Sequence, residues 1–110
     1  MIRISIFYPN RPGGRFDMAY YLEKHMPDSI ERLSAGKGFR GVSVDRGLNA
    51  GLPDSAPAYV AMCQYLFDTA EDFMAIFGVH ASTLQSDIAR YTDIEPVILF
   101  SGVMISHGGA

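Results

Sequence analysis

Charged side chains are scarce in this sequence of 110 residues, and the basic ones form no block. Only 19% of the residues are charged, whereas globular domains usually have about 25%. The sequence has nine Lys and Arg residues and 12 Asp and Glu residues, which gives a net charge of −3. Proteins that bind nucleic acid or an anionic membrane need a positive surface. The composition therefore argues against both kinds of partner.

Cysteine and long apolar runs are also missing. The single cysteine, Cys63, cannot form an internal disulfide or by itself a thiolate metal site, and we expect it to be an inert core residue. Residues 1–9 are too short a segment for a signal peptide. The longest apolar run, 97–105, is broken by Ser101 and Gly102 and has about half the length of a membrane helix. We expect a cytoplasmic protein.

Hydrophobic residues, by contrast, make up 48% of the chain, enough for the core of one domain. We place this domain at residues 1–106 and a flexible tail at 107–110. Apolar spacing predicts strands over 2–8, 39–48, 58–67 and 94–105, and helices over 17–35 and 69–88. Within the first helix Pro27 is expected to disturb the backbone right after His25, and Gly78 is expected to weaken the second helix.

The order strand, helix, strand, strand, helix, strand predicts an α+β fold of the ferredoxin-like βαββαβ type. Right-handed crossovers then give an antiparallel sheet with strand order 4-1-3-2 and both helices on one face. The third strand, 58–67, is apolar on both sides, as expected of a central strand. The second strand carries charges and the fourth carries Pro96, as expected of edge strands.

The sheet face away from the helices needs a cover in this fold. Val97 and Leu99 point to one face and Ile98 and Phe100 to the other, so the last strand is apolar on both sides. Exposed apolar patches of this kind mark interaction sites. We therefore predict a homodimer that forms through the sheet faces. The alternative is a monomer whose sheet is partly covered by the long loop at 47–57 and by the tail.

Two histidines are the best candidates for chemistry. His25 lies beside the apolar stripe of the first helix and His80 within that of the second, so both are expected to face the layer between helices and sheet. Either histidine could equally be a satisfied core residue. No His, Asp and Glu triplet has metal-ligand spacing, so no metal is expected. A small-molecule cavity is expected, and its other candidate wall residues are Tyr21, Met26, Arg40, Tyr59 and Tyr65.

Two segments resemble a known family. The block Phe16-Asp17-Met18-Ala19-Tyr20-Tyr21-Leu22-Glu23-Lys24-His25-Met26-Pro27 and the later Tyr91-Thr92-Asp93-Ile94-Glu95-Pro96-Val97-Ile98 are similar to the EthD family, named for ethyl tert-butyl ether degradation. The resemblance implies a dimeric α/β barrel built from ferredoxin-like subunits, with a cavity between sheet and helices. It matches His25 to a helix histidine that acts as acid or base in methylisomerase-like relatives, whereas His80 lies outside the motif.

These observations lead to competing hypotheses of function. The first is a cofactor-free isomerase, cyclase or lyase acting on a small carbonyl, lactone or aromatic compound. His25 would move a proton, Tyr21 or Tyr65 would orient the substrate, and His80 would assist. The second is a non-catalytic ligand-binding accessory protein of a monooxygenase-linked degradation pathway. A haem- or flavin-linked helper is a third, but no cofactor motif is evident. A His25 that has a polar partner and faces open space would favour the enzyme.

Overall fold

The computed structural model describes residues 1–108 as four strands and a set of helices in the predicted order. The strands are β1 (Ile2–Pro9), β2 (Phe39–Arg46), β3 (Tyr59–Phe67) and β4 (Val97–Gly102). The helices are α1 (Met18–Tyr20), the π-helical turn η1 (Tyr21–His25), α2 (Met26–Leu33) and α3 (Ala70–Ile88). The tail predicted for 107–110 lies partly outside the described residues.

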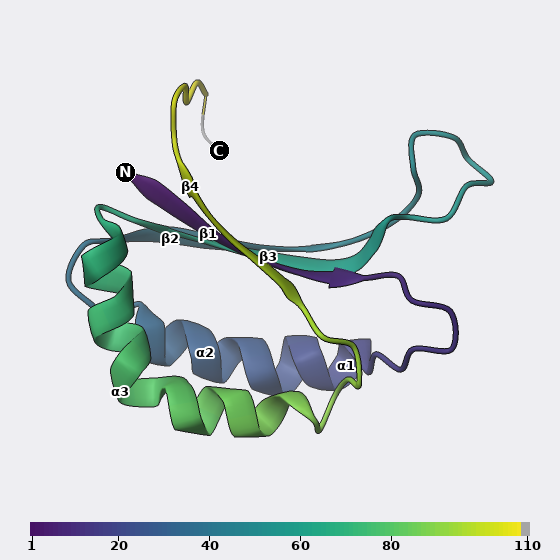
Figure 1. The fold of residues 1–110 in the computed structure, drawn as a ribbon, viewed down its shortest axis with the longest axis horizontal. Helices are drawn as coiled ribbons and strands as arrows, with labels where there is room; N and C mark the ends of the chain where they lie inside the picture. The colour runs from purple at the N-terminus through teal and green to yellow at the C-terminus, as the bar shows by residue number, and fades with distance from the viewer. Residues whose placement is uncertain (109–110) are drawn as a thin grey trace.

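The sheet is antiparallel, with the strand order β2-β3-β1-β4. This is the predicted order, with β3 and β1 inside and β2 and β4 at the edges. All helices lie on one side of the sheet, and the loop between β2 and β3 projects beyond it (Figure 1). The ferredoxin-like prediction is confirmed.

The first helical segment begins as the sequence predicts. The Asp17 carboxylate accepts a hydrogen bond from the Tyr20 backbone N–H at 3.0 Å and caps the helix. Phe16 packs on Tyr21 with ring centroids 5.0 Å apart. The helix changes type right after His25, where the sequence predicts a disturbance: the π turn ends at His25 and α2 begins at Met26. Single π turns within an α-helix are often found at functional sites.

The second predicted helix is α3, and it is continuous. Thr69 caps it by accepting a hydrogen bond from the Asp72 backbone N–H at 3.1 Å. The helix does not break at Gly78. Figure 1 shows instead that α3 changes direction along its length, so that its second half runs beside α2 and η1.

The core lies between the helices and the sheet and is rich in aromatic rings. Every second residue of β3 is buried against the helices, and these residues are Ala61, Cys63, Tyr65 and Phe67. Their neighbours toward the other face are half-buried. We call the face away from the helices the open face. By the strand register it carries Arg3, Ser5 and Phe7 of β1 and the residues paired with them.

The β4 strand is shorter than predicted and is the least covered part of the sheet. Its four apolar residues at 97–100 are between 42% and 59% exposed, on both faces. The helices therefore leave apolar surface uncovered even on their own side of the sheet. No helix within residues 1–108 is both long and apolar enough to span a membrane.

Candidate functional site

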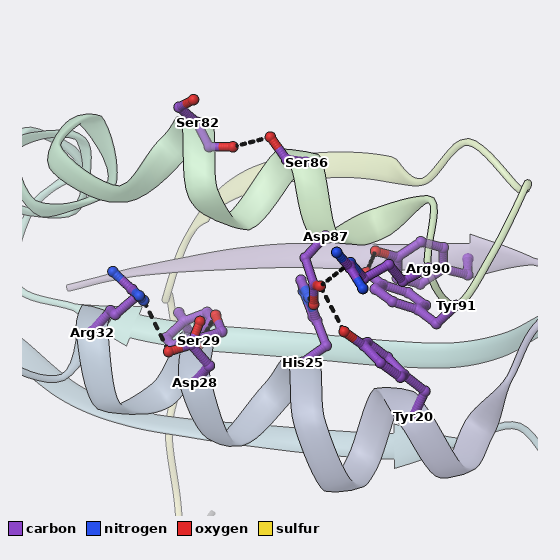
Figure 2. A network of polar contacts seen from close by, with 12 residues as sticks. Tyr20, His25, Asp28, Ser29, Arg32, Ser82, Ser86, Asp87, Arg90 and Tyr91 are labelled. Atoms are coloured by element: carbon purple, nitrogen blue, oxygen red, sulfur yellow. Dashed lines mark hydrogen bonds and ion pairs between the residues drawn. The ribbon is translucent and has the colours of Figure 1, made fainter.

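His25 lies at the end of the π turn with its ring between the helices and the sheet. The side chain is 9% exposed, and Nδ1 lies 2.9 Å from the Asp87 carboxylate Oδ2 (Figure 2). Asp87 comes from the last turn of α3, 62 residues later in the chain. The pair therefore joins the two helical segments across their interface.

The Asp87 carboxylate is held in its charged form by several donors. The Tyr20 hydroxyl donates to Oδ1 at 2.7 Å, and Arg90 Nε lies 3.5 Å from the same oxygen. Burial disfavours the charge, but the hydrogen bonds from Tyr20 and His25, with the charges of His25 and Arg90, outweigh it and lower the pKa of Asp87 below its ordinary value. An ionised carboxylate only accepts, so Nδ1 of His25 is the protonated, donating nitrogen.

Aromatic rings fix the orientation of the His25 imidazole. Tyr91 lies 4.6 Å away between ring centroids, and Tyr21 stacks nearly parallel at 6.1 Å. Tyr91 is itself held by a 2.6 Å hydrogen bond between its hydroxyl and that of Tyr8. The π turn places Tyr21 and His25 on the same buried side of the helix. The ring is thus positioned by contacts on several sides.

His25 lines one of two adjoining cavities. One, of about 90 Å³, is lined by His25, Gln85 and apolar side chains of β1, α3 and β4. The other, of about 210 Å³, is more apolar and lies further along α3 toward Phe73. They share four lining residues, Ile6, Phe77, Gln85 and Ile98. We call the two together the α3–β4 groove.

Only one ring nitrogen of His25, Nε2, is available to interact with a molecule in the groove. Nδ1 is bound to Asp87, and no group among residues 1–108 hydrogen-bonds Nε2. A neutral imidazole with Nδ1 protonated has a lone pair on Nε2, so this nitrogen can accept a proton from a molecule in the groove. The carboxylate fixes the tautomer, as in other carboxylate–histidine pairs.

The remaining predicted site residues of the first helix and β3 do not line the groove. Tyr21 is fully buried, and its hydroxyl has no hydrogen-bond partner among the described residues. Burial raises its pKa far above the usual value. Tyr65 is bound to the Ser29 hydroxyl at 2.7 Å, and Met26 is a buried core residue. Tyr21 thus supports the His25 ring, while Tyr65 and Met26 belong to the core.

Three other predicted residues lie elsewhere. His80 is half-buried between α2 and α3, where its Nδ1 lies 3.1 Å from an Arg32 nitrogen, so it does not share the groove with His25. Arg40 makes a bidentate ion pair with Asp68 near the end of β3. Tyr59 packs on Phe7 of the open face, because a bulge in the β1–β3 ladder changes the register beside it. The predicted cluster is thus dispersed.

Asp87 and Gln85 are the polar residues that sequence reasoning missed. A signal for Asp87 was present, because an acidic side chain in the last turn of a helix opposes the helix dipole and needs compensation. Gln85 gave no signal, since an exposed glutamine on a helix is ordinary. For metal binding, residues 1–108 contain no group of three His, Cys, Asp or Glu that could hold an ion.

Comparison with solved structures finds a protein that is similar over nearly the whole chain. It is an EthD-like protein of Ralstonia eutropha JMP134, with 40% sequence identity and a TM-score of 0.87. The match covers 96% of this chain and 94% of that one. This chain belongs to the EthD family. No family model matches the sequence, and no curated protein does either.

Two more distant structures share the fold of this EthD-family chain. An EthD family protein of Bacillus halodurans C-125 is 16% identical, with a TM-score of 0.64 over 94% of this chain and 99% of that one. HapK from Hahella chejuensis is 14% identical, with a TM-score of 0.59 over 100% of this chain and 99% of that one. At these identities the likeness extends to the fold alone.

The sequence block that resembles the EthD family has a structural explanation in this member. Tyr20 donates to Asp87, Tyr21 stacks on His25, and His25 donates to Asp87. Pro27 lies in the first turn of α2, directly after the π turn. The block thus builds one half of the carboxylate–histidine pair, and the other half comes from α3.

Proposed function

We propose that this EthD-family protein catalyses cofactor-free acid–base chemistry on a small carbonyl, lactone or aromatic compound bound in the α3–β4 groove. One observation carries the proposal: His25 has one nitrogen fixed by Asp87 and lies at the wall of a cavity. A buried histidine held only by backbone and packed in solid core would have no such capacity. The apolar lining suits a small organic molecule.

The chemistry that fits this arrangement is proton transfer next to a carbonyl. Nε2 of His25 takes a proton from a substrate carbon, and the electron pair of the broken C–H bond moves into the enolate. The imidazolium then returns the proton to another carbon or to the oxygen. No oxidant or reductant is needed, so the outcome is an isomerisation, a cyclisation or an elimination. Gln85, shared by both cavities, provides the amide that a substrate oxygen would meet.

Solvent exchange tests this proposal without knowledge of the natural substrate. Small ketones, lactones and aromatic ketones are incubated with the protein in D2O, and deuterium uptake is followed by mass spectrometry. We expect at least one class to exchange faster with the protein than without it. His25→Asn should lower that acceleration about a hundredfold or more, as expected for loss of a general base. His107→Asn, which removes an exposed histidine of the C-terminal segment, is the matched control.

Two outcomes would contradict the proposal: no acceleration with any class, or acceleration that survives His25→Asn. Compounds that bind in the groove without any exchange would favour the accessory role, in which the protein holds a ligand of a degradation pathway without converting it.

We also propose that the protein works as a homodimer through the open face of the sheet. The exposed Val97 and Leu99 of β4 and the half-buried Phe7, Met62 and Leu66 support this, since all lie on the open face and a monomer would leave them against water. Light scattering should give twice the chain mass. Leu99→Lys on the open face should produce monomers, whereas Ile98→Lys on the helix side should not. A monomeric wild-type protein would contradict this proposal.

A further inference from the structure

Arg3 lies on the open face of the sheet and has no ion-pair partner among residues 1–108. It lies in β1 opposite Leu66 of β3, and its side chain is half-buried. It makes no hydrogen bond or ion pair with any group in the part of the chain that is described. A guanidinium has five N–H donors and keeps its charge at any physiological pH. The donors of Arg3 are therefore available to a partner from outside the subunit.

The surroundings of Arg3 form a polar hollow. It measures about 270 Å³ and is lined by side chains and backbone of β1, β2 and β3, among them Arg40, Ser43, Gln64 and Leu66. Ser43 and Gln64 are direct register partners, so both stand on the open face in the same row. Gln64 also donates to Ser5 at 3.3 Å, which leaves its carbonyl oxygen and one N–H free.

The charge balance of the hollow leaves one positive charge available. Arg40 is also at the hollow, but both of its contacting nitrogens are bound to Asp68, at 2.7 and 3.0 Å. The guanidinium of Arg40 also lowers the pKa of Asp68 below its usual value, so that pair is fully charged and internally neutral. Arg3 therefore provides a single unmatched cation, flanked by a hydroxyl and an amide that can donate.

We infer that this hollow is a second ligand site, which binds the carboxylate of a small organic acid. Arg3 would donate two parallel hydrogen bonds to the two carboxylate oxygens. Ser43 and Gln64 would donate further hydrogen bonds, and Leu66 would contact the apolar part of the ligand. A monoanion matches the single free charge better than a phosphate dianion does. The inference does not depend on His25. In the homodimer proposed above, the hollow lies between the two sheets, where exclusion of water strengthens the ion pair.

NMR titration of the full-length protein tests the site with benzoate as the probe. We expect saturable shifts of the Arg3 Nε–H and of the Gln64 side-chain amide, while the signals of His25 and Asp87 stay unchanged. Benzamide, which has the same ring without the charge, should produce no such shifts. Arg3→Gln should weaken benzoate binding about tenfold or more. Arg46→Gln removes the same charge from the end of β2, outside the hollow, and should leave benzoate binding unaltered.

Three results would overturn the inference. The first is that benzoate shifts nothing at Arg3 or Gln64. The second is that benzamide or chloride at equal concentration produces the same shifts. The third is that the Arg3 signal changes in Asp45→Asn, since Asp45 also lies on the open face and a second copy could supply it as the counter-charge. That result would make Asp45 of a second copy, and not a ligand, the counter-charge of Arg3.

Discussion

Replacing Asp87 by Asn tests the carboxylate–histidine pair through stability. Asn keeps the shape and can still accept from Tyr20, but it presents an NH2 group where Asp87 accepts the proton on His25 Nδ1. Two donors would then face each other unless the His25 proton moves to Nε2, and in either case the charge-assisted bond at 2.9 Å is lost. A hydrogen bond to a charged group contributes about 1.5–3 kcal/mol. The Asp87 side chain is 27% exposed, so solvent screening reduces this figure, and we expect a loss of about 2 kcal/mol.

A loss of this size is readily measured by urea unfolding at fixed protein concentration. It corresponds to a fall in melting temperature on the order of 8 °C for a domain of this length. The matched control is Asp28→Asn, because Asp28 is 46% exposed and forms a surface pair with Arg32. That change should alter the free energy of unfolding by only about 0.5 kcal/mol or less.

The difference between wild type and Asp87→Asn should also depend on pH in one direction. The folded pKa of Asp87 lies below the ordinary value of 3.8, so its contribution to stability is complete above that pH. The contribution is then lost as the pH falls through the lower, folded-state pKa. Equal urea midpoints for Asp87→Asn and Asp28→Asn at neutral pH would refute the reasoning.

Three further predictions concern the scaffold. Burial raises the pKa of the Cys63 thiol to about 12, so a thiol reagent at mildly alkaline pH should label it only after unfolding; rapid labelling of the native protein would contradict this. Thr69→Ala removes the cap of α3 and should lower the free energy of unfolding by about 1 kcal/mol, while Thr83→Ala on the exposed side of α3 should lower it far less. Gly38→Ala should cost more than about 1 kcal/mol, because Gly38 has a φ of 80° and an added Cβ would clash with Asp72; an unchanged urea midpoint would contradict this.

The fold could be predicted because its elements follow local rules. Asp17 and Thr69 are cap residues, the apolar spacing gives the strands and helices, and right-handed crossovers leave one strand order. The ends of the strands and the course of α3 could not be predicted as well from the sequence. β4 begins only after Pro96 and ends at Gly102, so it is shorter than its apolar pattern indicates. α3 runs through Gly78 without a break.

The site could be predicted only in part, because its partners come from distant segments. His25 was found from its place on the helix and from the resemblance to the EthD family. Asp87 lies 62 residues away, and only the packing of α3 on η1 brings the two together. His80 has a helical position similar to that of a groove residue, yet Arg32 holds it on the side of α3 that faces α2. Sequence periodicity predicts which residues share one face of a helix. It does not predict which other element packs against that face.

The account rests on Asp87 holding His25 so that Nε2 is free toward the groove. Long-range proton–nitrogen NMR of the histidine rings measures this directly, at a pH where the ring is neutral. We predict that the proton of His25 resides on Nδ1 in the wild-type protein, and that Asp87→Asn shifts it to Nε2 or mixes the two forms. A proton on Nε2 in the wild type, or a His25 signal that does not respond to Asp87→Asn, would contradict the account.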